Sequence, residues 1–276
     1  MKKLNFICIG AQKAGTTALT KILSQHEKIN FPPIKELHYF SNLKKYPSTD
    51  FTRLSFFEKL LNESRRVKKL LILIIIHLFK MNYKEFLFLI KYTFLPLNNR
   101  RYLLFLKKNL VNGEITPAYF MLKQAEIDKM KKINPNLKII ILLRHPVQRT
   151  VSSFYQKYRH NPKLHTLKNF RTFLVSDFNL LRQSYKDTID LYKKNFHNVL
   201  ILSNKQLLND KINSFNKILT FLEIKMTQDF EKILKKEVIY NETKFIKNPK
   251  FFLLADEMLH ESKKEYEQII NQYNLK

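Results

Sequence analysis

Short apolar runs alternate along the chain with longer stretches in which apolar residues recur every three or four positions. A run such as Lys138–Leu143, with five apolar residues in succession, is typical of a strand buried on both faces of a parallel sheet. The strands expected from this criterion are Leu4–Ile9, Lys28–Phe31, Lys138–Leu143 and Val199–Leu202. The expected helices are Thr17–His26, Val147–Tyr158, Leu181–Phe196, Phe215–Leu222 and Asp256–Tyr273. Such alternation predicts an α/β fold with a mostly parallel sheet flanked by helices, whose ligands bind beyond the carboxyl ends of the strands.

The pattern changes between Ser64 and Lys108. A basic stretch leads into the apolar run Leu70–Phe79, and a second apolar run follows at Phe86–Ile90. The first run is about half the length that spans a bilayer, and lysines interrupt its continuation. We therefore expect an inserted segment of two amphipathic helices. Either these helices pack on the core as a lid over an acceptor site, or they lie with an apolar face on an anionic membrane surface.

Length and composition favour a single domain over residues 1–276. Of the 276 residues, 45% are hydrophobic and 13% aromatic, which is enough for one large core. The single cysteine, Cys8, excludes an internal disulfide and is expected to be a small buried hydrophobe. Met1–Ile9 resembles the start of a signal peptide, but its apolar stretch is short. We therefore expect the first strand of a cytoplasmic protein, with peripheral contact at the inner membrane face as an alternative.

The formal net charge of +27 is extreme. Such a field attracts anions, including nucleotides, nucleic acid, anionic lipid and acidic saccharides. A lysine-rich solvated surface accounts for the charge equally well, because a codon bias raises Lys, Asn and Ile together. Charge alone therefore does not select a function.

A glycine-containing loop follows the first expected strand and opens the first expected helix. It reads Gly10-Ala11-Gln12-Lys13-Ala14-Gly15-Thr16-Thr17 and holds two of the three glycines of the chain. Backbone N–H groups at a helix N-terminus bind anions, and glycine allows close approach to phosphate oxygens. The glycine spacing is that of a nucleotide triphosphatase loop, but Thr16 stands where that loop has lysine. The lysine instead lies inside the loop, as Lys13.

A second anion-binding sequence, Arg144 to Tyr155, follows the strand expected at Lys138–Leu143. Arg144 stands at the strand end, and Ser152 lies eight positions later in a helix that Pro146 is suited to begin. A guanidinium group offers a planar fork for phosphate oxygens, and a serine hydroxyl adds a neutral donor. Two such loops suit a nucleotide that carries a phosphate group at each end.

Together the two loops resemble those of sulfotransferases that use 3′-phosphoadenosine 5′-phosphosulfate (PAPS). The resemblance implies a P-loop-type fold in which the first loop holds the 5′-phosphosulfate, and Arg144 and Ser152 hold the 3′-phosphate. The first-loop residues that it assigns to the cosubstrate are Gly10, Lys13, Ala14, Gly15, Thr16 and Thr17. Lys13 is also assigned a catalytic role, because it sits where charge develops on the departing phosphate. With lysine and helix N-terminus in that role, no metal is expected.

The segment Lys35-Glu36-Leu37-His38-Tyr39-Phe40 is similar to the Lys-Glu-x-His-Phe-Phe segment of carbohydrate sulfotransferases of the heparan-sulfate type. That resemblance makes Glu36 the catalytic base and places His38 beside the acceptor. Because the two residues are two positions apart, both side chains point the same way if the segment is extended.

The segment Gly113 to Tyr119 is similar to the Gly-Glu-Lys-Thr-Pro-x-Tyr segment of the same group. Ile115 stands in place of the lysine, which in that group can reach the sulfuryl group or an anionic acceptor. This difference argues against a strongly acidic acceptor.

Two further resemblances extend the nucleotide site toward the C-terminus. Ser184-Tyr185 corresponds to a Gly-x-Tyr region of the family, which makes Tyr185 a nucleotide contact. Asn241 to Lys244 is similar to the segment before the family's C-terminal nucleotide loop, but the usual Lys-Gly-Arg of that loop is missing. Lys244, with Lys247 and Lys250, is the expected source of its charge.

The sequence therefore predicts transfer of a sulfuryl group from PAPS to an acceptor hydroxyl group, with Glu36 as base. A sugar hydroxyl of a glycan, glycolipid or cell-surface polysaccharide is favoured, and a small-molecule alcohol is the open alternative. A P-loop kinase or nucleotide triphosphatase is the first alternative and would require magnesium. A basic nucleic-acid-binding protein is the second alternative. No zinc finger or RNA-recognition aromatic motif is present, so no specific nucleic-acid partner is expected.

Overall fold

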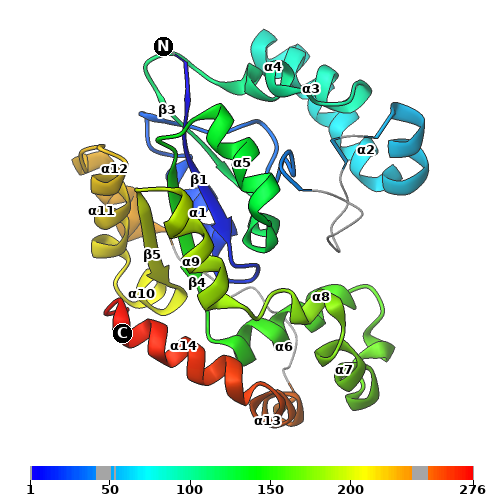
Figure 1. The fold of residues 1–276 in the computed structure, drawn as a ribbon. Coiled ribbons are helices and arrows are strands. Elements are labelled where there is room, and N and C mark those ends of the chain that lie inside the picture. Colours follow the sequence, from blue (N-terminus) through cyan, green and yellow to red (C-terminus); the bar gives the residue numbers. More distant parts are fainter. Residues whose placement is uncertain (1, 42–50, 53, 238–247, 276) are drawn as a thin grey trace.

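Five strands form one sheet in the order β2-β3-β1-β4-β5, and every neighbouring pair is parallel (Figure 1). The structure is a computed structural model and describes residues 2–41, 51–52, 54–237 and 248–275. The strands are β1 (Leu4–Gly10), β2 (Ile29–Asn30), β3 (Val111–Ile115), β4 (Lys138–Leu143) and β5 (Val199–Ser203). The predicted α/β fold with a mostly parallel sheet is confirmed.

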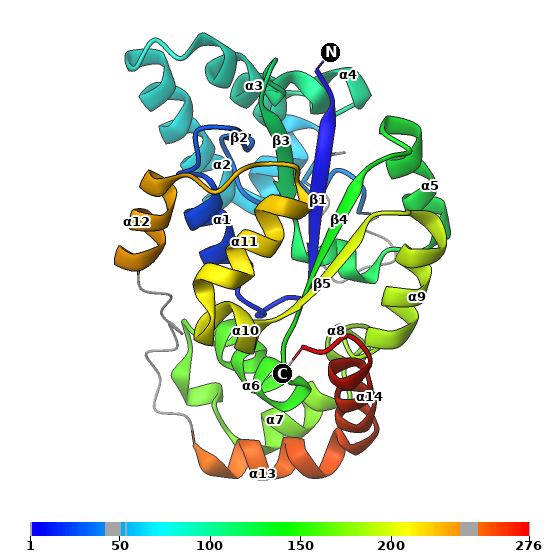
Figure 2. The same ribbon diagram turned by 90° about the vertical axis from the view of Figure 1, so that its left-hand side faces the viewer.

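Helices cover both sides of the sheet. In Figure 2, α1 and α11 lie on one side of the strands and α5 and α9 on the other, while α6, α7 and α13 gather beyond the end of β1 and β4. The α-helices are α1 (Thr16–Leu23), α2 (Phe56–Phe79), α3 (Tyr83–Phe94), α4 (Asn99–Tyr102), α5 (Gln124–Ile133), α6 (Pro146–Lys157), α7 (Leu167–Leu174), α8 (Asp177–Leu180), α9 (Tyr185–Asn195), α10 (Asn204–Asn209), α11 (Lys211–Phe221), α12 (Gln228–Lys236), α13 (Pro249–Met258) and α14 (His260–Gln272). Three 3-10 helices are η1 (Leu103–Phe105), η2 (Pro117–Met121) and η3 (Pro162–Leu164).

The central strands β1 and β4 are almost completely buried, as their apolar sequences predict. All five residues of 139–143 have no exposed surface. Cys8 is buried beside them, and burial raises the pKa of its thiol to about 12, so the cysteine is the small buried hydrophobe that the sequence predicted.

The order of the strands places a topological switch point at the centre of the sheet. From β1 the chain passes through α1 to the edge strand β2, and β3 then fills the place between them. The next strand, β4, pairs with the other edge of β1. Ligands of open α/β sheets bind where the strand order reverses, which here is beyond the carboxyl ends of β1 and β4.

The sequence analysis did not predict β3, because alternate residues of this strand are polar and buried. Asn112 accepts a hydrogen bond from the side chain of Asn30 (2.8 Å) and donates one to the carbonyl of Lys3 (3.1 Å). Polar residues that are satisfied by hydrogen bonds inside a protein leave no apolar signature in the sequence. The expected helix Asp256–Tyr273 is also two helices, α13 and α14, which are separated at Leu259.

The inserted segment forms a helical hairpin, α2 and α3, as predicted. The helix α2 begins at Phe56, where Ser55 and Glu58 form a capping box, and it is kinked at Glu63, directly before the expected start at Ser64. The two views show the hairpin projecting to one side, away from α13 and α14 (Figures 1 and 2). Within the residues that the structure describes, no helix is long and apolar enough to cross a membrane.

Candidate active site

The two predicted phosphate loops, which follow β1 and β4, are in direct contact. The Arg144 Nη1 atom donates a hydrogen bond to the carbonyl oxygen of Lys13 (2.8 Å). Tyr185 Oη, at the start of α9, donates to the carbonyl of Arg144 (2.7 Å). Asn204 Nδ2, at the start of α10, donates to the carbonyl of Ala14 (3.0 Å). The loops of three βα units are thus fastened together through their backbone carbonyl groups. Tyr185 itself is buried beneath Arg144, at the start of α9.

The helices that begin at these loops, α1 and α6, have N-termini with no side-chain cap. Neither helix has an acidic residue in its first turn, whereas α2 is closed by its capping box. The first N–H groups of a helix need an acceptor, and an anion supplies one. In α1 the cap residue is Gly15 with φ 99°, and Thr16 and Thr17 form the first turn. Two helix N-termini are therefore free of competing side-chain acceptors where the nucleotide is expected.

Arg144 has the burial and the unmet hydrogen-bonding capacity expected of an anion ligand. Its side chain is 6% exposed, and its Nε atom is buried without a partner in the described part of the chain. Burial lowers the pKa of the guanidinium, because no nearby carboxylate offsets the loss of water. Ser152, the second residue predicted for the 3′-phosphate, is buried on α6. A phosphate group would accept hydrogen bonds from the Arg144 guanidinium and the Ser152 hydroxyl and would balance the buried positive charge.

Two further arginines, Arg149 and Arg182, are buried close to this position. Arg149 Nη2 donates to Thr150 Oγ1 (3.1 Å) and Asn179 Oδ1 (3.2 Å). Arg182 donates to the carbonyl of Phe178, and burial, followed by the charge of Arg149, lowers its pKa to about 9. Among the described residues, none of these arginines forms an ion pair with a carboxylate.

Uncompensated buried guanidinium groups concentrate positive potential behind the 3′-phosphate motif. The sequence analysis did not single out Arg182. In a linear sequence a buried arginine looks like any surface arginine, so no signal was available to find it.

On the acceptor side, a chain of polar contacts joins the first phosphate loop to the predicted base. Lys35 Nζ donates to Thr17 Oγ1 (2.7 Å) and lies 3.4 Å from Glu36 Oε1. The other carboxylate oxygen, Glu36 Oε2, lies 3.7 Å from His38 Nε2. The structure thus brings together four residues that the sequence placed in two separate motifs.

The carboxyl group of Glu36 is held in its ionised form by its neighbours. Partial burial alone would raise its pKa, but the neighbouring His38 ring and the Lys35 ammonium outweigh this effect and hold the pKa below its ordinary value. The side chain is 38% exposed, so an acceptor can reach the carboxylate.

The segment that carries Glu36 and His38 is not extended. Glu36 and His38 have φ values of 60° and 59°, in the left-handed region. The insertion stabilises this turn, since Arg66 Nη2 donates to the carbonyl of Glu36 (3.1 Å) and Tyr92 Oη donates to that of Leu37 (3.4 Å). Contacts from residues distant in sequence therefore override the extended geometry, and the two side chains meet by a turn.

A buried carboxylate, Glu114 in β3, is the centre of a hydrogen-bond network that supports the segment Lys35–Phe40. It accepts hydrogen bonds from Thr116 Oγ1 (2.6 Å) and Tyr119 Oη (2.8 Å), and also from Tyr102 Oη. Burial raises its pKa. The Tyr119 hydroxyl also accepts a bond from the backbone N–H of Phe40 (3.3 Å), and the Tyr102 ring stacks on Tyr39 with centroids 4.2 Å apart. This network holds the segment that carries Glu36 and His38 against the sheet.

The C-terminal part of the predicted nucleotide site lies largely outside the described residues. This is true of Lys244 and Lys247, whereas Lys250 is exposed in the first turn of α13. The residues on either side of the gap contact the helices of the phosphate loops. Glu237 forms an ion pair with Lys21 of α1 (2.7 Å), and the N–H of Asn248 donates to Tyr155 Oη on α6 (3.0 Å).

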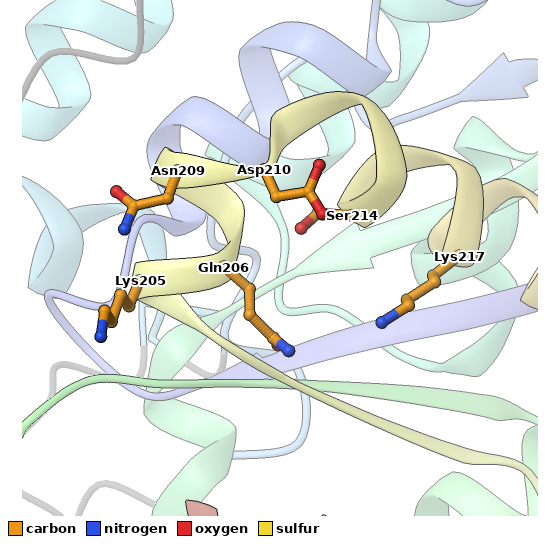
Figure 3. Close-up of a pocket in the computed structure, with 6 residues that line it drawn as sticks. All are labelled: Lys205, Gln206, Asn209, Asp210, Ser214 and Lys217. Atoms are coloured by element: carbon orange, nitrogen blue, oxygen red, sulfur yellow. The ribbon is translucent and has the colours of Figure 1, made fainter. Parts of the chain in front are cut away.

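Two shallow pockets lie apart from these loops. One is formed by α10 and α11, where Gln206 and Lys217 point toward one another (Figure 3). The other lies between the start of α9 and α14 and includes Glu261 and Lys264. No predicted site residue lines either pocket. In the described ranges, no group of three or more His, Cys, Asp or Glu side chains is placed to hold a metal ion.

The fold and the paired anion loops at the switch point define a nucleotide-binding α/β protein of the P-loop type. Sequence comparison is more specific. Residues 5–229 match the family described as the Sulfotransferase family, and because this match spans most of the chain, the chain belongs to that family and is an enzyme of the sulfotransferase class. No curated protein matches the chain at a significant level.

Solved structures agree with this fold. A sulfotransferase from Alicyclobacillus acidocaldarius is 19% identical with a TM-score of 0.57, covering 96% of this chain and 97% of that chain. The sulfotransferase domain of a Synechococcus olefin synthase is 14% identical, with a TM-score of 0.54 and coverage of 93% and 95%. A mouse sulfotransferase complexed with PAP, the desulfated product of PAPS, is 16% identical, with a TM-score of 0.51 and coverage of 98% and 88%. Family membership decides against the kinase and nucleic-acid alternatives.

Proposed function

We propose that the protein transfers a sulfuryl group from PAPS to a hydroxyl group of a carbohydrate acceptor, on a glycan or a glycolipid. The observation that carries the nucleotide part is the hydrogen bond between Arg144 and the carbonyl of Lys13. It joins the two loops that suit the two ends of a nucleotide phosphorylated at both 5′ and 3′ positions. The PAP complex of the mouse protein with the same fold supports this choice of cosubstrate.

In the proposed binding mode, the backbone N–H groups of Gly15, Thr16 and Thr17 hold the 5′-phosphosulfate together with Gly10, Lys13 and Ala14. Arg144 and Ser152 hold the 3′-phosphate, and the charges of Arg149 and Arg182 add to the potential behind it. Tyr185 supports Arg144 from beneath through its carbonyl. Lys244 is proposed to add charge near the nucleotide from the C-terminal segment.

The proposed reaction is an in-line displacement at sulfur. The acceptor oxygen forms a bond to sulfur while the bond between sulfur and the 5′-phosphate oxygen breaks, and PAP leaves. Glu36 accepts the proton of the attacking hydroxyl, and Lys13 stabilises the negative charge that develops on the departing oxygen. His38, 3.7 Å from Glu36, orients the acceptor. Protein groups and helix N-termini supply the charge stabilisation in this scheme.

The acceptor class rests on the similarity of the Lys35–Phe40 segment to carbohydrate sulfotransferases and on the accessible, ionised Glu36 carboxylate. Ile115 is 2% exposed inside β3, so this segment presents no cation to an acceptor at that position. A neutral or weakly acidic sugar hydroxyl is therefore the preferred acceptor.

Calorimetric titration with PAP, with and without magnesium, tests the nucleotide assignment. We expect tight binding that is independent of magnesium, and a loss of at least about tenfold in affinity for Arg144→Ala, because a charge-assisted contact to phosphate is removed. Arg171→Ala, which removes an exposed arginine from α7, is the matched control and keeps wild-type affinity.

Folding of each variant is checked by circular dichroism before titration. Equal binding of ATP and PAP by the folded wild type, or binding that requires magnesium, would contradict the proposal.

A further inference from the structure

The α2–α3 hairpin divides into a buried base and an exposed tip. At the base, buried side chains such as Val67, Leu70 and Phe88 pack into the core. Beyond Leu70, none of residues 71–87 is buried. These residues, called here the hairpin tip, carry nine of the twenty large apolar side chains that are exposed in the described part of the chain: Leu71, Ile72, Ile75, Ile76, Leu78, Phe79, Met81, Tyr83 and Leu87.

The apolar surface of the tip is concentrated at its far end, where α2 turns into α3. Phe79 is 82% exposed, Met81 68% and Tyr83 61%. Exposed apolar side chains that occur singly need no explanation, but a contiguous group on one projecting element marks an interaction surface. The exposed apolar residues of α2 in the tip share one broad face of the helix, which continues into the exposed side chains at the turn.

The insertion that carries the tip has almost only positive charges, of which those of Lys80 and Lys84 lie in the tip itself. Residues 64–108 contain eleven basic side chains and one acidic side chain, a net charge of +10 in 45 residues, whereas the other 231 residues carry +17. The one acidic residue, Glu85, is neutralised by Lys107 (2.6 Å). Lys80 and Lys84 lie exposed on either side of the tip turn. The partner that fits is therefore apolar and negatively charged, and a second copy of this segment is disfavoured by charge repulsion.

The base of the hairpin is fastened to the candidate active site. Arg66 on α2 donates to the carbonyl of Glu36, and to Tyr92 Oη on α3 (2.7 Å), which in turn donates to the carbonyl of Leu37. Lys59, at the start of α2, donates to the carbonyls of Tyr92, Thr93 and Leu95 at the end of α3. The hairpin is therefore joined by these hydrogen bonds to the segment that carries Glu36, so binding at the tip also positions that segment.

We propose that the hairpin tip docks the protein on an anionic lipid bilayer. The apolar side chains at the turn enter the interface between headgroups and acyl chains, and the flanking lysines contact lipid phosphates. This inference is independent of the proposed cosubstrate, because it rests on the tip alone. It places the active site beside a membrane surface and so favours acceptors that are anchored there.

The chain contains no tryptophan, so a single introduced tryptophan reports on the tip without background. Phe79→Trp is the probe, and Leu253→Trp, at a position 70% exposed on α13, is the matched control. Both are titrated with vesicles of phosphatidylcholine alone or mixed with phosphatidylglycerol. We expect a blue shift and quenching by brominated acyl chains for Phe79→Trp only, with phosphatidylglycerol vesicles only, weakening as salt rises.

Sedimentation with the same vesicles gives a second readout. Phe79→Ser/Met81→Ser and Lys80→Glu/Lys84→Glu are each expected to lower binding about tenfold or more. The control Lys129→Glu/Lys132→Glu, on exposed positions of α5, stays close to wild type. PAP binding by every variant shows that the fold is retained.

Three results would overturn the proposal. The first is an unshifted Phe79→Trp spectrum with phosphatidylglycerol vesicles in a protein that still binds PAP. The second is vesicle binding that survives both tip variants, which would assign it to the general basic surface. The third is a blue shift that depends on protein concentration without vesicles, which would identify a second copy as the partner.

Discussion

The nucleotide side and the acceptor side of the candidate active site are built in different ways. On the nucleotide side, the loops after β1 and β4 are fastened by Arg144, Tyr185 and Asn204, all of which bond to backbone carbonyls of neighbouring βα units. On the acceptor side, the turn at Glu36 lies six residues after the two-residue edge strand β2 and is stabilised by Arg66 and Tyr92 from the insertion.

The comparison shows which part of the site depends on the fold and which depends on this particular chain. The place of the nucleotide side, at a switch point beyond the carboxyl ends of β1 and β4, follows from the topology of the sheet. The acceptor turn depends on side chains from an inserted segment. Changes on the two sides are therefore expected to separate, with nucleotide affinity responding to one and turnover to the other.

The largest separation is expected from Glu36→Gln. Removing a general base lowers turnover by about 10²- to 10⁴-fold, while PAP affinity stays at the wild-type value because the carboxylate does not hold the nucleotide. Turnover is measured with labelled PAPS and a saccharide that the wild type sulfates, and affinity by calorimetry. Glu27→Gln, an exposed change of the same kind, is the control. Wild-type turnover in Glu36→Gln would remove Glu36 from the mechanism.

The opposite pattern is expected from Gly15→Ala. A Cβ atom at this position, where φ is 99°, would lie 2.9 Å from Asn204 Nδ2. An alanine in the left-handed region costs about 1–2 kcal/mol, so we expect roughly a tenfold loss of PAP affinity as the loop is displaced. Titration with PAP measures the loss. An unchanged dissociation constant would show that the loop geometry at Gly15 is not used to bind the nucleotide.

A smaller effect, confined to turnover, is expected from Arg66→Ala. Loss of the bond to the Glu36 carbonyl lets the turn relax, and we expect kcat to fall about fivefold, which corresponds to the roughly 1 kcal/mol that one typical hydrogen bond contributes. PAP affinity is unaffected. Arg65→Ala removes the exposed neighbouring arginine and serves as the control. If Arg66→Ala weakened PAP binding as much as turnover, the two sides of the site would not be separable.

The smallest effect is expected from Lys35→Met. Lys35 contacts both Thr17 on the nucleotide side and Glu36 on the acceptor side. Because a protonated Glu36 cannot accept the hydroxyl proton, turnover falls as the pH drops through the pKa of Glu36. That pKa is held below its ordinary value of 4.5 by His38 and Lys35, so the acid limb of the kcat profile lies below pH 4.5 in the wild type. Removing the Lys35 charge moves the limb upward, toward the ordinary pKa of a carboxyl group. Lys28→Met, at an exposed position, leaves the limb in place.

The sequence predicts the strands and loops of the nucleotide side well, because their signals are local. The run of five apolar residues in β4 and the placement of Gly10 and Gly15 each identify a strand end in a few residues. The acceptor side is less readable. Glycine favours a left-handed turn, but neither Glu36 nor His38 is a residue type that indicates one. The contacts that stabilise the turn come from Arg66 and Tyr92, which are distant in the sequence.

Buried polar residues explain the other differences. Because Asn112 and Glu114 are polar, the hydrophobicity pattern of β3 is that of a loop. Each of these side chains is nevertheless satisfied by hydrogen bonds inside the protein. Arg182 appears in the sequence as one of many basic residues. In each case the deciding information is the identity of a partner distant in sequence, which no local pattern contains.

The pairing of β1 has a consequence for synthesis of the protein. This first strand pairs with residues 112–115 on one edge and with residues 138–141 on the other. At ribosomal rates of about 5–20 residues per second, the edge that pairs with β4 stays without its partner for roughly 7 to 27 seconds after the strand is made. Nascent chains therefore expose a strand prone to aggregation, and chaperone supply is expected to limit yield. The loop at residues 10–17, although among the first residues translated, lacks its hydrogen bond from Arg144 until that residue has emerged.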